Sequence, residues 1–323
     1  MRDTVLRQQW QFLLTSQIYR GLWAMHPGQA MSQGATIQQL MNRDWAGSDQ
    51  TEDLDKTRGR SALPVAVISA AGHLFSGSES FDKVPQGSTA VIPLKGTMLK
   101  YGTMCTYGTE EIAGQILEAG SHRNISSVII DIDSGGGAVD AVAPIVQSII
   151  KIRNEAKKPV VASADLCASA AMWAASACTR IVANNEISAE FGSIGVMMSF
   201  MDIIPYYEKE GFKFHSIYAP ESDYKNKPFQ LALEGKYEEI QNEELSPLAL
   251  SFQNAIKANR GSKLNLEVPG LLNGRMFFAK NDKDNSLNAK EVGLIDEVGT
   301  FDLAVRLARD LARSAFVEKY VQS

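Results

Sequence analysis

Residues 159–178 read PVVASADLCASAAMWAASAC. The first four, with two adjacent valines, favour a β-strand, and the alanine-rich remainder favours a helix. Ser169 lies between the two parts, where the chain would turn from strand to helix. The small side chains around it let another backbone segment or a substrate approach closely. This stretch therefore suits a serine nucleophile, and it equally suits a tightly packed helix capped by a serine.

Two other serines and a cysteine could compete with Ser169 for that role. Ser163 and Ser176 carry the same hydroxyl group, and Ser176 lies two helical turns further along. Cys167 could act as a thiolate, but no histidine lies near it in the sequence. A small buried apolar residue is the more ordinary role for such a cysteine. Other segments are needed to choose among these side chains.

Strand and helix patterns alternate around this stretch. Short runs rich in β-branched residues predict strands at 65–68, 90–94, 128–132, 159–162 and 180–183. Helices are predicted at 109–119, with Thr109 as a candidate N-cap, and at 138–153. Such a β-α-β-α-β order is typical of an α/β domain with mainly parallel strands and right-handed crossovers.

The later part of the chain is predicted to be mostly helical. We expect a helix near 200–210, a strand at 214–218 and a helix at 301–315. A long helix is predicted from Gly235 to Asn259. Pro247 either sits within it or breaks it, because proline lacks the backbone N–H that a helix needs.

The first 85 residues differ in pattern from the rest. Apolar residues at helical spacing predict an amphipathic helix over 4–24, which packs on the protein's own core or contacts a partner. Residues 44–62 are polar and predict a linker. We therefore expect a helical N-terminal appendage with a linker at 1–85, one α/β domain at 86–315 and a tail at 316–323.

Composition limits the class of protein. The 32 basic and 37 acidic residues give a net charge of −5, which argues against nonspecific nucleic-acid binding. Three cysteines without paired spacing fit a reducing compartment, and four scattered histidines argue against a structural zinc site. No run reaches the roughly 18–20 apolar residues of a membrane span, and no secretory leader is evident. These features predict a cytosolic protein without a membrane anchor.

A glycine run follows the strand predicted at 128–132. Residues 133–137 read DSGGG, and a helix is expected directly after them. Glycines allow a strained turn with outward-pointing N–H groups, which could hold a phosphate or form an oxyanion hole. The run matches neither a P-loop nor a G-x-G-x-x-G motif. A plain tight turn is the alternative.

Two later segments also carry chemically useful residues. Residues 192–196 read GSIGV, and residues 222–229 read SDYKNKPF. Lys225 and Lys227 in the second segment are, by default, solvated loop cations. A lysine becomes a general base only where desolvation or nearby positive charge lowers its pKa well below about 10.4.

Together these segments resemble peptidase family S49, which includes signal peptide peptidase A and phage capsid-assembly proteases of the lambda protein C type. The resemblance runs from Thr89 to Ala312 and rests on six motifs in the same order. They are SGGG at 134–137, ASAA at 168–171, GSIGV at 192–196, YK before PF at 224–229, NGRMF at 273–277 and EVGLIDE at 291–297.

The resemblance implies a ClpP/crotonase-type α/β fold, with a mainly parallel sheet and flanking helices, and a Ser–Lys dyad. Ser169 matches the nucleophile, and Lys225 matches the general base, with Lys227 as the fallback. Ser193 matches a serine that hydrogen-bonds and orients the lysine. No metal or nucleotide cofactor is implied.

The resemblance also assigns the oxyanion hole to the glycine run. Gly136 matches the residue whose amide holds the oxyanion, with Gly135 and Gly137 as its neighbours. Gly135 stands where the family often has proline, so the turn is expected to be looser. Ala170-Ala171 replace a Gly-Gly pair usual in the membrane peptidases and are more similar to the phage-type members. The polar residues 281–288 look like a surface insertion.

The function implied is a serine endopeptidase that forms an acyl-enzyme, acts on a protein or peptide substrate and processes phage capsid or scaffold proteins. Family members can form the dyad between neighbouring protomers, so a homo-oligomer is expected, in the host cytosol or the virion. Two alternatives stay open. One is another enzyme on the crotonase fold, either an acyl-transfer enzyme or one such as an acyl-CoA hydratase or hydrolase. The other is a catalytically inactive structural protein associated with the capsid or portal.

Overall fold

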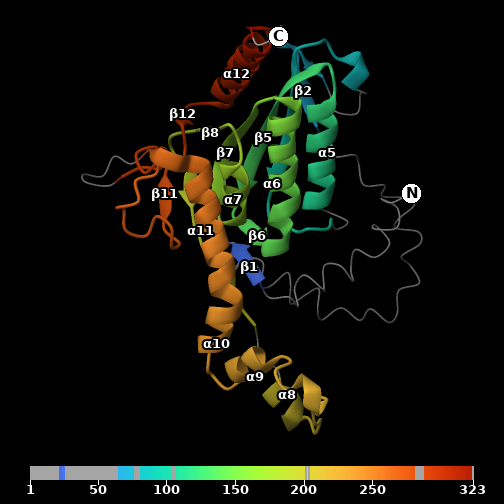
Figure 1. The fold of residues 1–323 in the computed structure, drawn as a ribbon, viewed down its shortest axis with the longest axis vertical. Coiled ribbons are helices and arrows are strands. Elements are labelled where there is room, and N and C mark those ends of the chain that lie inside the picture. Colours follow the sequence, from blue (N-terminus) through green and yellow to red (C-terminus); the bar gives the residue numbers. More distant parts are fainter. Residues whose placement is uncertain are drawn as a thin grey trace.

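The computed structural model describes residues 22–25, 65–75, 81–102, 106–200, 202, 204–280 and 287–321. Its body is a mixed α/β fold in which helices cover a central sheet (Figure 1). The strands of this sheet are β2 (Ala66–Ile68), β3 (Leu74–Phe75), β4 (Ser88–Lys95), β5 (Ile125–Ser134), β7 (Val160–Ala168), β8 (Arg180–Ala183), β9 (Glu190–Gly192), β11 (Met276–Phe278) and β12 (Glu297–Val298).

The centre of the sheet is parallel, as the alternating pattern predicts. The strand order is β11-β9-β7-β5-β4-β2-β3, and β8 also pairs with β7 and carries β12 on its other side. The pairs β4–β5, β5–β7, β7–β8, β7–β9 and β8–β12 are parallel. Among the described strands of this sheet, only the outer pairs β2–β3, β2–β4 and β9–β11 are antiparallel.

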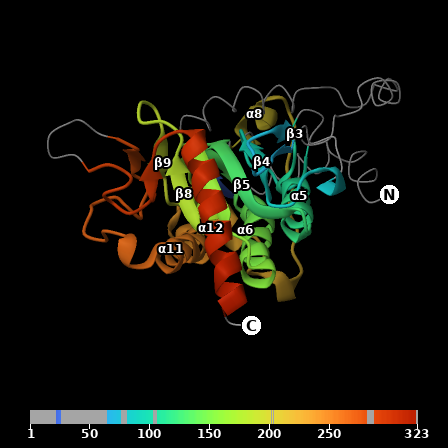
Figure 2. The same ribbon diagram turned by 90° about the horizontal axis from the view of Figure 1, so that it is seen from above.

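Helices cover both faces of the sheet, and the residues of β5 show how. Val128, Ile130 and Ile132 belong to the large core formed with α5 (Thr109–Ser121), α6 (Val142–Lys151), α7 (Ala170–Ser176) and α11 (Ser246–Arg260). Ile129 points to the other face, where it packs with α12 (Phe301–Val321). α12 crosses the sheet over β4, β5 and β7 (Figure 2). α12 runs beyond the predicted end at 315.

The start of α5 corrects one predicted cap. Gly108, not Thr109, is the N-cap residue, and the Glu111 carboxylate accepts a hydrogen bond of 2.8 Å from the Gly108 N–H. The Thr109 hydroxyl is buried without a hydrogen-bond partner. Glu111 reaches back from the first turn, so a carboxylate supplies the cap that a threonine was predicted to supply.

The glycine run is a strand and not a turn that leads straight into a helix. Gly136–Ala138 form β6, and a single 3₁₀ turn (Val139–Ala141) precedes α6. Glycine is required at Gly137 because a Cβ there would lie 2.0 Å from the Met98 carbonyl oxygen. This backbone contact between Gly137 and Met98 favours an extended strand over a tight turn.

The described residues of the segment 199–245, here called the arm, project from the body at the lower end of α11 (Figure 1). Its elements are α8 (Ile204–Lys209), a 3₁₀ turn (Pro220–Ser222), α9 (Lys227–Leu233), α10 (Glu238–Ile240) and a π-type turn (Gln241–Leu245). The strand predicted at 214–218 is wrong: these residues are irregular and pair with none of the strands in the described part of the chain. The long helix predicted from Gly235 is interrupted by the π-type turn, and Pro247 lies in the first turn of α11, where its missing N–H is tolerated.

A second, three-stranded sheet contains residues 22–25, the part of the first 64 residues that the structure describes. Its order is β10-β1-β6, with β1 at Leu22–Met25 and β10 at Met197–Met198. The prediction of a helix over 4–24 is therefore wrong at Leu22, where the chain is extended. Residues 1–21, the predicted linker at 44–62 and most of the polar segment at 281–288 lie outside the described residues.

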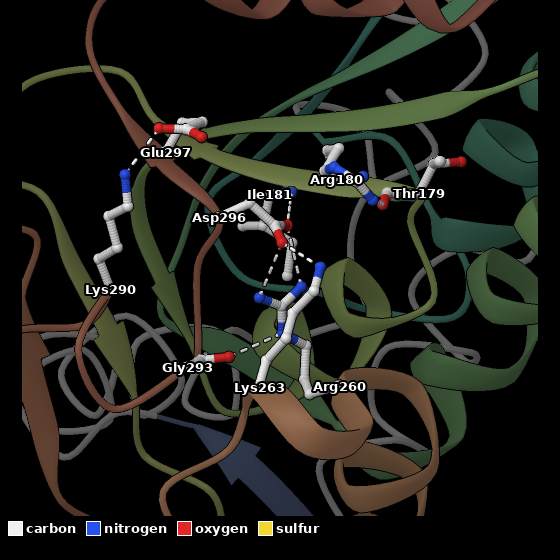
Figure 3. Close-up of polar contacts among 9 residues, drawn as sticks. All are labelled: Thr179, Arg180, Ile181, Arg260, Lys263, Lys290, Gly293, Asp296 and Glu297. Atoms are coloured by element: carbon white, nitrogen blue, oxygen red, sulfur yellow. Dashed lines mark hydrogen bonds and ion pairs between the residues drawn. The ribbon is translucent and has the colours of Figure 1, made fainter. Parts of the chain in front are cut away.

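Asp296 anchors the end of α11 to the start of β8 (Figure 3). Its carboxylate accepts hydrogen bonds from Arg260 (Nη1 at 3.0 Å, Nη2 at 3.2 Å) and from the Ile181 N–H (2.8 Å). It also forms an ion pair with Lys263, while Arg260 Nε donates to the Gly293 carbonyl. The Arg260 and Asp296 side chains are only 2% and 8% exposed. Within the EVGLIDE motif at 291–297, Gly293 and Asp296 therefore contribute to the stability of the fold.

Replacing Asp296 by alanine should lower the free energy of unfolding by about 3–5 kcal/mol, because the Arg260 charge is left buried and unpaired. Burial acts to raise the pKa of the Asp296 carboxyl, but hydrogen bonds from Arg260 and Lys263 outweigh it and hold the pKa below 3.8. The stabilisation is therefore complete above pH 3.8 and is lost as the pH falls through the lower pKa of the folded protein. Urea unfolding near pH 7 and below pH 4 measures both effects.

Asp310→Ala is the matched control for this prediction. Asp310 pairs with Arg313 on the exposed side of α12, and both side chains are more than half exposed. Exposed pairs contribute little, so this variant should unfold like the parent protein. An equal loss of stability in the two variants would contradict the anchoring role of Asp296.

Candidate active site

The predicted site residues follow three neighbouring parallel strands at one edge of the sheet. β5 leads into the glycine run, β7 leads into Ser169, and β9 leads into Ser193. β7 lies between the other two, with Cys167 paired to Ser134 on one side and Ala168 paired to Gly192 on the other. The carboxyl ends of parallel strands are where α/β folds place ligand sites. The structure therefore gathers these segments as one candidate site.

Ser169 has an unusual backbone conformation at the junction of β7 and α7. Its φ is 56° and its ψ is −120°, which non-glycine residues rarely adopt. Its N–H donates to the Gly192 carbonyl (2.8 Å), and its carbonyl accepts from the Trp173 N–H (2.9 Å), so both sides hold the strained residue in place. Ser169 is 1% exposed, and its hydroxyl makes no capping hydrogen bond. Strain of this kind, of order 1–3 kcal/mol, is concentrated at functional sites.

The competing nucleophiles are placed differently. The Ser176 hydroxyl donates to the Trp173 carbonyl and accepts from Asn259, so it is engaged in packing α7. Ser163 lies in the middle of β7, fully buried. Cys167 is also fully buried, and burial, with a smaller contribution from Cys178, raises the pKa of its thiol far above the usual range. A thiol with that pKa is a poor nucleophile.

Ser193 has the same kind of strain as Ser169. Its φ is 53° and it is 7% exposed. Its N–H donates to the carbonyl of Arg275, at 3.0 Å, and a Cβ on the preceding Gly192 would lie 2.3 Å from that carbonyl oxygen. The sequence predicts no role for the NGRMF motif at 273–277. In the structure, its Arg275 backbone holds Ser193 in position.

The glycines of the run have separate environments. The Gly136 N–H donates to the Ser134 hydroxyl (3.2 Å), and the Gly136 carbonyl accepts from the Met98 N–H (2.9 Å). The Met98 carbonyl in turn accepts from the Ala138 N–H (2.9 Å). Peptide groups alternate in direction along a strand, so the N–H and carbonyl of Gly137 face the opposite side, where β1 lies.

The predicted base, Lys225, and the fallback, Lys227, do not lie at the candidate site within a single chain. Lys225 lies in the turn before α9, with an exposed side chain. Figure 1 shows α9 near the end of the arm, well separated from α7. Lys227, the fallback base, begins α9, and its Nζ lies 5.2 Å from the centre of the Tyr224 ring. One chain alone therefore does not place either lysine beside Ser169.

Two features are absent from the described part of the chain. No helix there is both long enough and apolar enough to cross a membrane. No three histidine, cysteine, aspartate or glutamate side chains gather there as a potential metal site.

Two phage proteins are similar to this chain in sequence. The chain is 32% identical over 136 residues to the head-tail preconnector protein GP5 of Enterobacteria phage P21, which covers 40% of this chain and 26% of that protein. It is 26% identical over 229 residues to the capsid assembly protease C of Escherichia phage lambda, which covers 68% of this chain and 48% of that protein. The chain thus spans less than half the length of either relative.

The comparison with solved structures gives distant similarities. A mutant of the 1510-N membrane-bound stomatin-specific protease, in complex with a substrate peptide, matches with a TM-score of 0.40 at 17% identity, covering 67% of this chain and 76% of that chain. Among family models, that of Peptidase family S49 matches residues 152–314, just over half of the 323 residues. The chain belongs to peptidase family S49.

Proposed function

We propose that the protein is a serine endopeptidase whose nucleophile is Ser169. The observation that carries the proposal is the strained, buried Ser169 between β7 and α7, flanked by the glycine strand β6 and by Ser193. Other serine hydrolases also hold their nucleophile at a sharp, strained strand-to-helix turn. Membership of peptidase family S49 supports the same chemistry.

In the proposed reaction, a neutral Lys225 accepts the Ser169 proton while Oγ attacks the scissile carbonyl. The amides of the glycine run, Gly136 and Gly137, are the proposed oxyanion donors. Gly137 is proposed as the main donor, because the Gly136 N–H already donates to the Ser134 hydroxyl. Water then hydrolyses the acyl-enzyme with the same lysine as base. Ser193 is proposed to orient the lysine.

The base is proposed to come from a second copy of the chain. A general base must lie within hydrogen-bond reach of the proton that it takes, and Lys225 lies in the projecting arm of its own chain. The arm also exposes many large apolar side chains, which suits a surface covered in an oligomer. They are Phe200, Tyr206, Tyr207, Phe212, Phe214, Ile217, Tyr224, Phe229, Leu233 and Tyr237.

The proposed substrate class is a phage capsid or scaffold protein, and the proposed fold class is the ClpP/crotonase type. The substrate proposal is supported by the similarity to the capsid assembly protease of phage lambda, which spans 68% of this chain. The proposed place of action is accordingly the host cytosol or the assembling capsid.

Labelling with a fluorophosphonate tests the proposed nucleophile directly. Such a probe phosphonylates an activated serine, and mass spectrometry of the digested protein should locate it on Ser169. The Ser163→Ala variant should label to the same extent, because the Ser163 hydroxyl is buried without a partner and its loss is nearly neutral. Equal labelling of a Ser169→Ala variant would contradict the proposal.

A further inference from the structure

The short strand β1 occupies a place between two strands that carry site residues. It pairs antiparallel with β6 through Trp23–Ala138, Ala24–Gly137 and Met25–Gly136. On its other edge it pairs antiparallel with β10 through Leu22–Met198 and Trp23–Met197. A segment from the beginning of the chain thus completes a sheet whose other two strands come from residues 136–138 and 197–198.

The flanking strands show what β1 lies across. β6 follows β5, which pairs with one edge of β7, and β10 follows β9, which pairs with the other edge. Ser169 is the residue that follows β7, between these two edges. β1 therefore crosses the end of the sheet at which Ser169 lies, where the parallel strands reach their carboxyl ends. Figure 1 shows β1 beside β6 and below α7.

The register identifies one peptide carbonyl of β1 in particular. The Gly136 carbonyl and the Ala138 N–H bond to Met98, so the N–H of Gly137 faces β1. The residue of β1 that pairs with Gly137 is Ala24. If the Gly137 N–H is an oxyanion donor, the Ala24 carbonyl is the one that it addresses.

We infer that Leu22–Met25 binds as the protein's own substrate strand and that Ser169 cleaves the Ala24–Met25 peptide bond. This inference rests on the proposed function. Strand addition is a common way to hold an extended peptide, because backbone hydrogen bonds fix it on both edges. β1 has strands on both edges, as a bound peptide would, and it belongs to a segment remote in sequence from both partners.

The chemistry is an ordinary acyl transfer. Ser169 Oγ forms a bond to the Ala24 carbonyl carbon, and its proton passes to the lysine. The bond between that carbon and the Met25 nitrogen breaks, and the lysine proton goes to the new amine. Water then adds to the ester carbon and releases Ser169, which regains a proton. The products are residues 1–24, with a new carboxylate, and a chain that begins at Met25.

The test follows the mass of the purified full-length chain over time. Wild-type protein should convert to a species that begins at Met25, and at least about tenfold less of it should form with Ser169→Ala. Ala24→Pro should also prevent the cut, because it removes the N–H that faces Gly137 and distorts the strand. Ala30→Pro, which places proline outside β1, should be cut normally.

Fluorophosphonate labelling on the same samples separates this inference from the proposed function. A chain that labels at Ser169 and cleaves an added protein such as casein, yet stays intact or is cut at another bond, overturns self-cleavage alone. A chain that neither labels nor cleaves overturns both.

Hydrogen exchange tests the strand itself without requiring activity. In the uncleaved Ser169→Ala chain, the Gly137 amide should exchange at least about tenfold more slowly than in a Ser169→Ala chain that also carries Ala24→Pro. The matching Ser169→Ala chain with Ala30→Pro should keep the protection. Equal exchange of Gly137 in all three chains would overturn the placement of β1.

Discussion

Replacing Ser169 by alanine should lower kcat for peptide hydrolysis by about 10⁴-fold or more, the size of effect that loss of a serine nucleophile has in other peptidases. The fold should be unchanged, because the Ser169 hydroxyl makes no capping hydrogen bond and the backbone N–H and carbonyl that hold the residue remain. Steady-state hydrolysis of casein or of the cognate substrate, with thermal unfolding of both proteins, measures activity and stability separately.

The matched control for Ser169→Ala is Ser163→Ala. Both serines are buried residues on the same strand–helix segment, and the Ser163 hydroxyl lacks a hydrogen-bond partner. Ser163→Ala should keep full activity. Full activity in Ser169→Ala, with a stable fold, would mean that the hydrolysis has another nucleophile.

Lys225→Ala should abolish hydrolysis to a similar degree, and mixing it with Ser169→Ala should restore part of the activity. The reason is geometric: each variant keeps one half of the proposed dyad, and the arm of one chain would bring Lys225 to the Ser169 of another. Unfolding, mixing and refolding the two inactive proteins at equal concentration, followed by the casein assay, measures the recovery. If the two chains assemble at random, about one quarter of the sites hold both intact residues, and strict alternation of the two chains raises this to at most about one half.

Lys209→Ala is the control for the arm, because Lys209 lies on α8 of the same arm and is exposed. It should be active on its own. Lys227→Ala separates the fallback base from the first choice: it should retain activity while Lys225→Ala does not. Two inactive parents whose refolded mixture stays inactive would contradict a dyad shared between chains.

The order of strands and helices in the body could be predicted because each short apolar run is bounded by clear breakers. The β4, β5, β7 and β8 segments were all predicted, with α5 and α6 between them, and the parallel pairing followed from that alternation. The residues at which the strands end were less predictable. β7 runs on to Ala168 because its later residues pair with β9, a long-range contact that no local pattern encodes.

The candidate site could be predicted in part. Local residue types and the family resemblance singled out Ser169, Ser193 and the glycine run, and the structure brings these three segments to neighbouring strand ends. The conformation of the glycine run was not predictable, because its extended form depends on contact with Met98, 39 positions before Gly137. Nor was β1, since a four-residue strand between two distant partners leaves no periodicity in the sequence.

The hydrogen bond from Ser193 to Arg275 has a consequence for biosynthesis. Ribosomes make the chain from its N-terminus, so Ser169 emerges long before Arg275, and the Asp296 anchor emerges later still. A nascent chain that includes Ser169 but ends before Arg275 and β11 therefore has no Arg275 carbonyl to hold Ser193. The proposed site is completed only after residues 276–278 have been made.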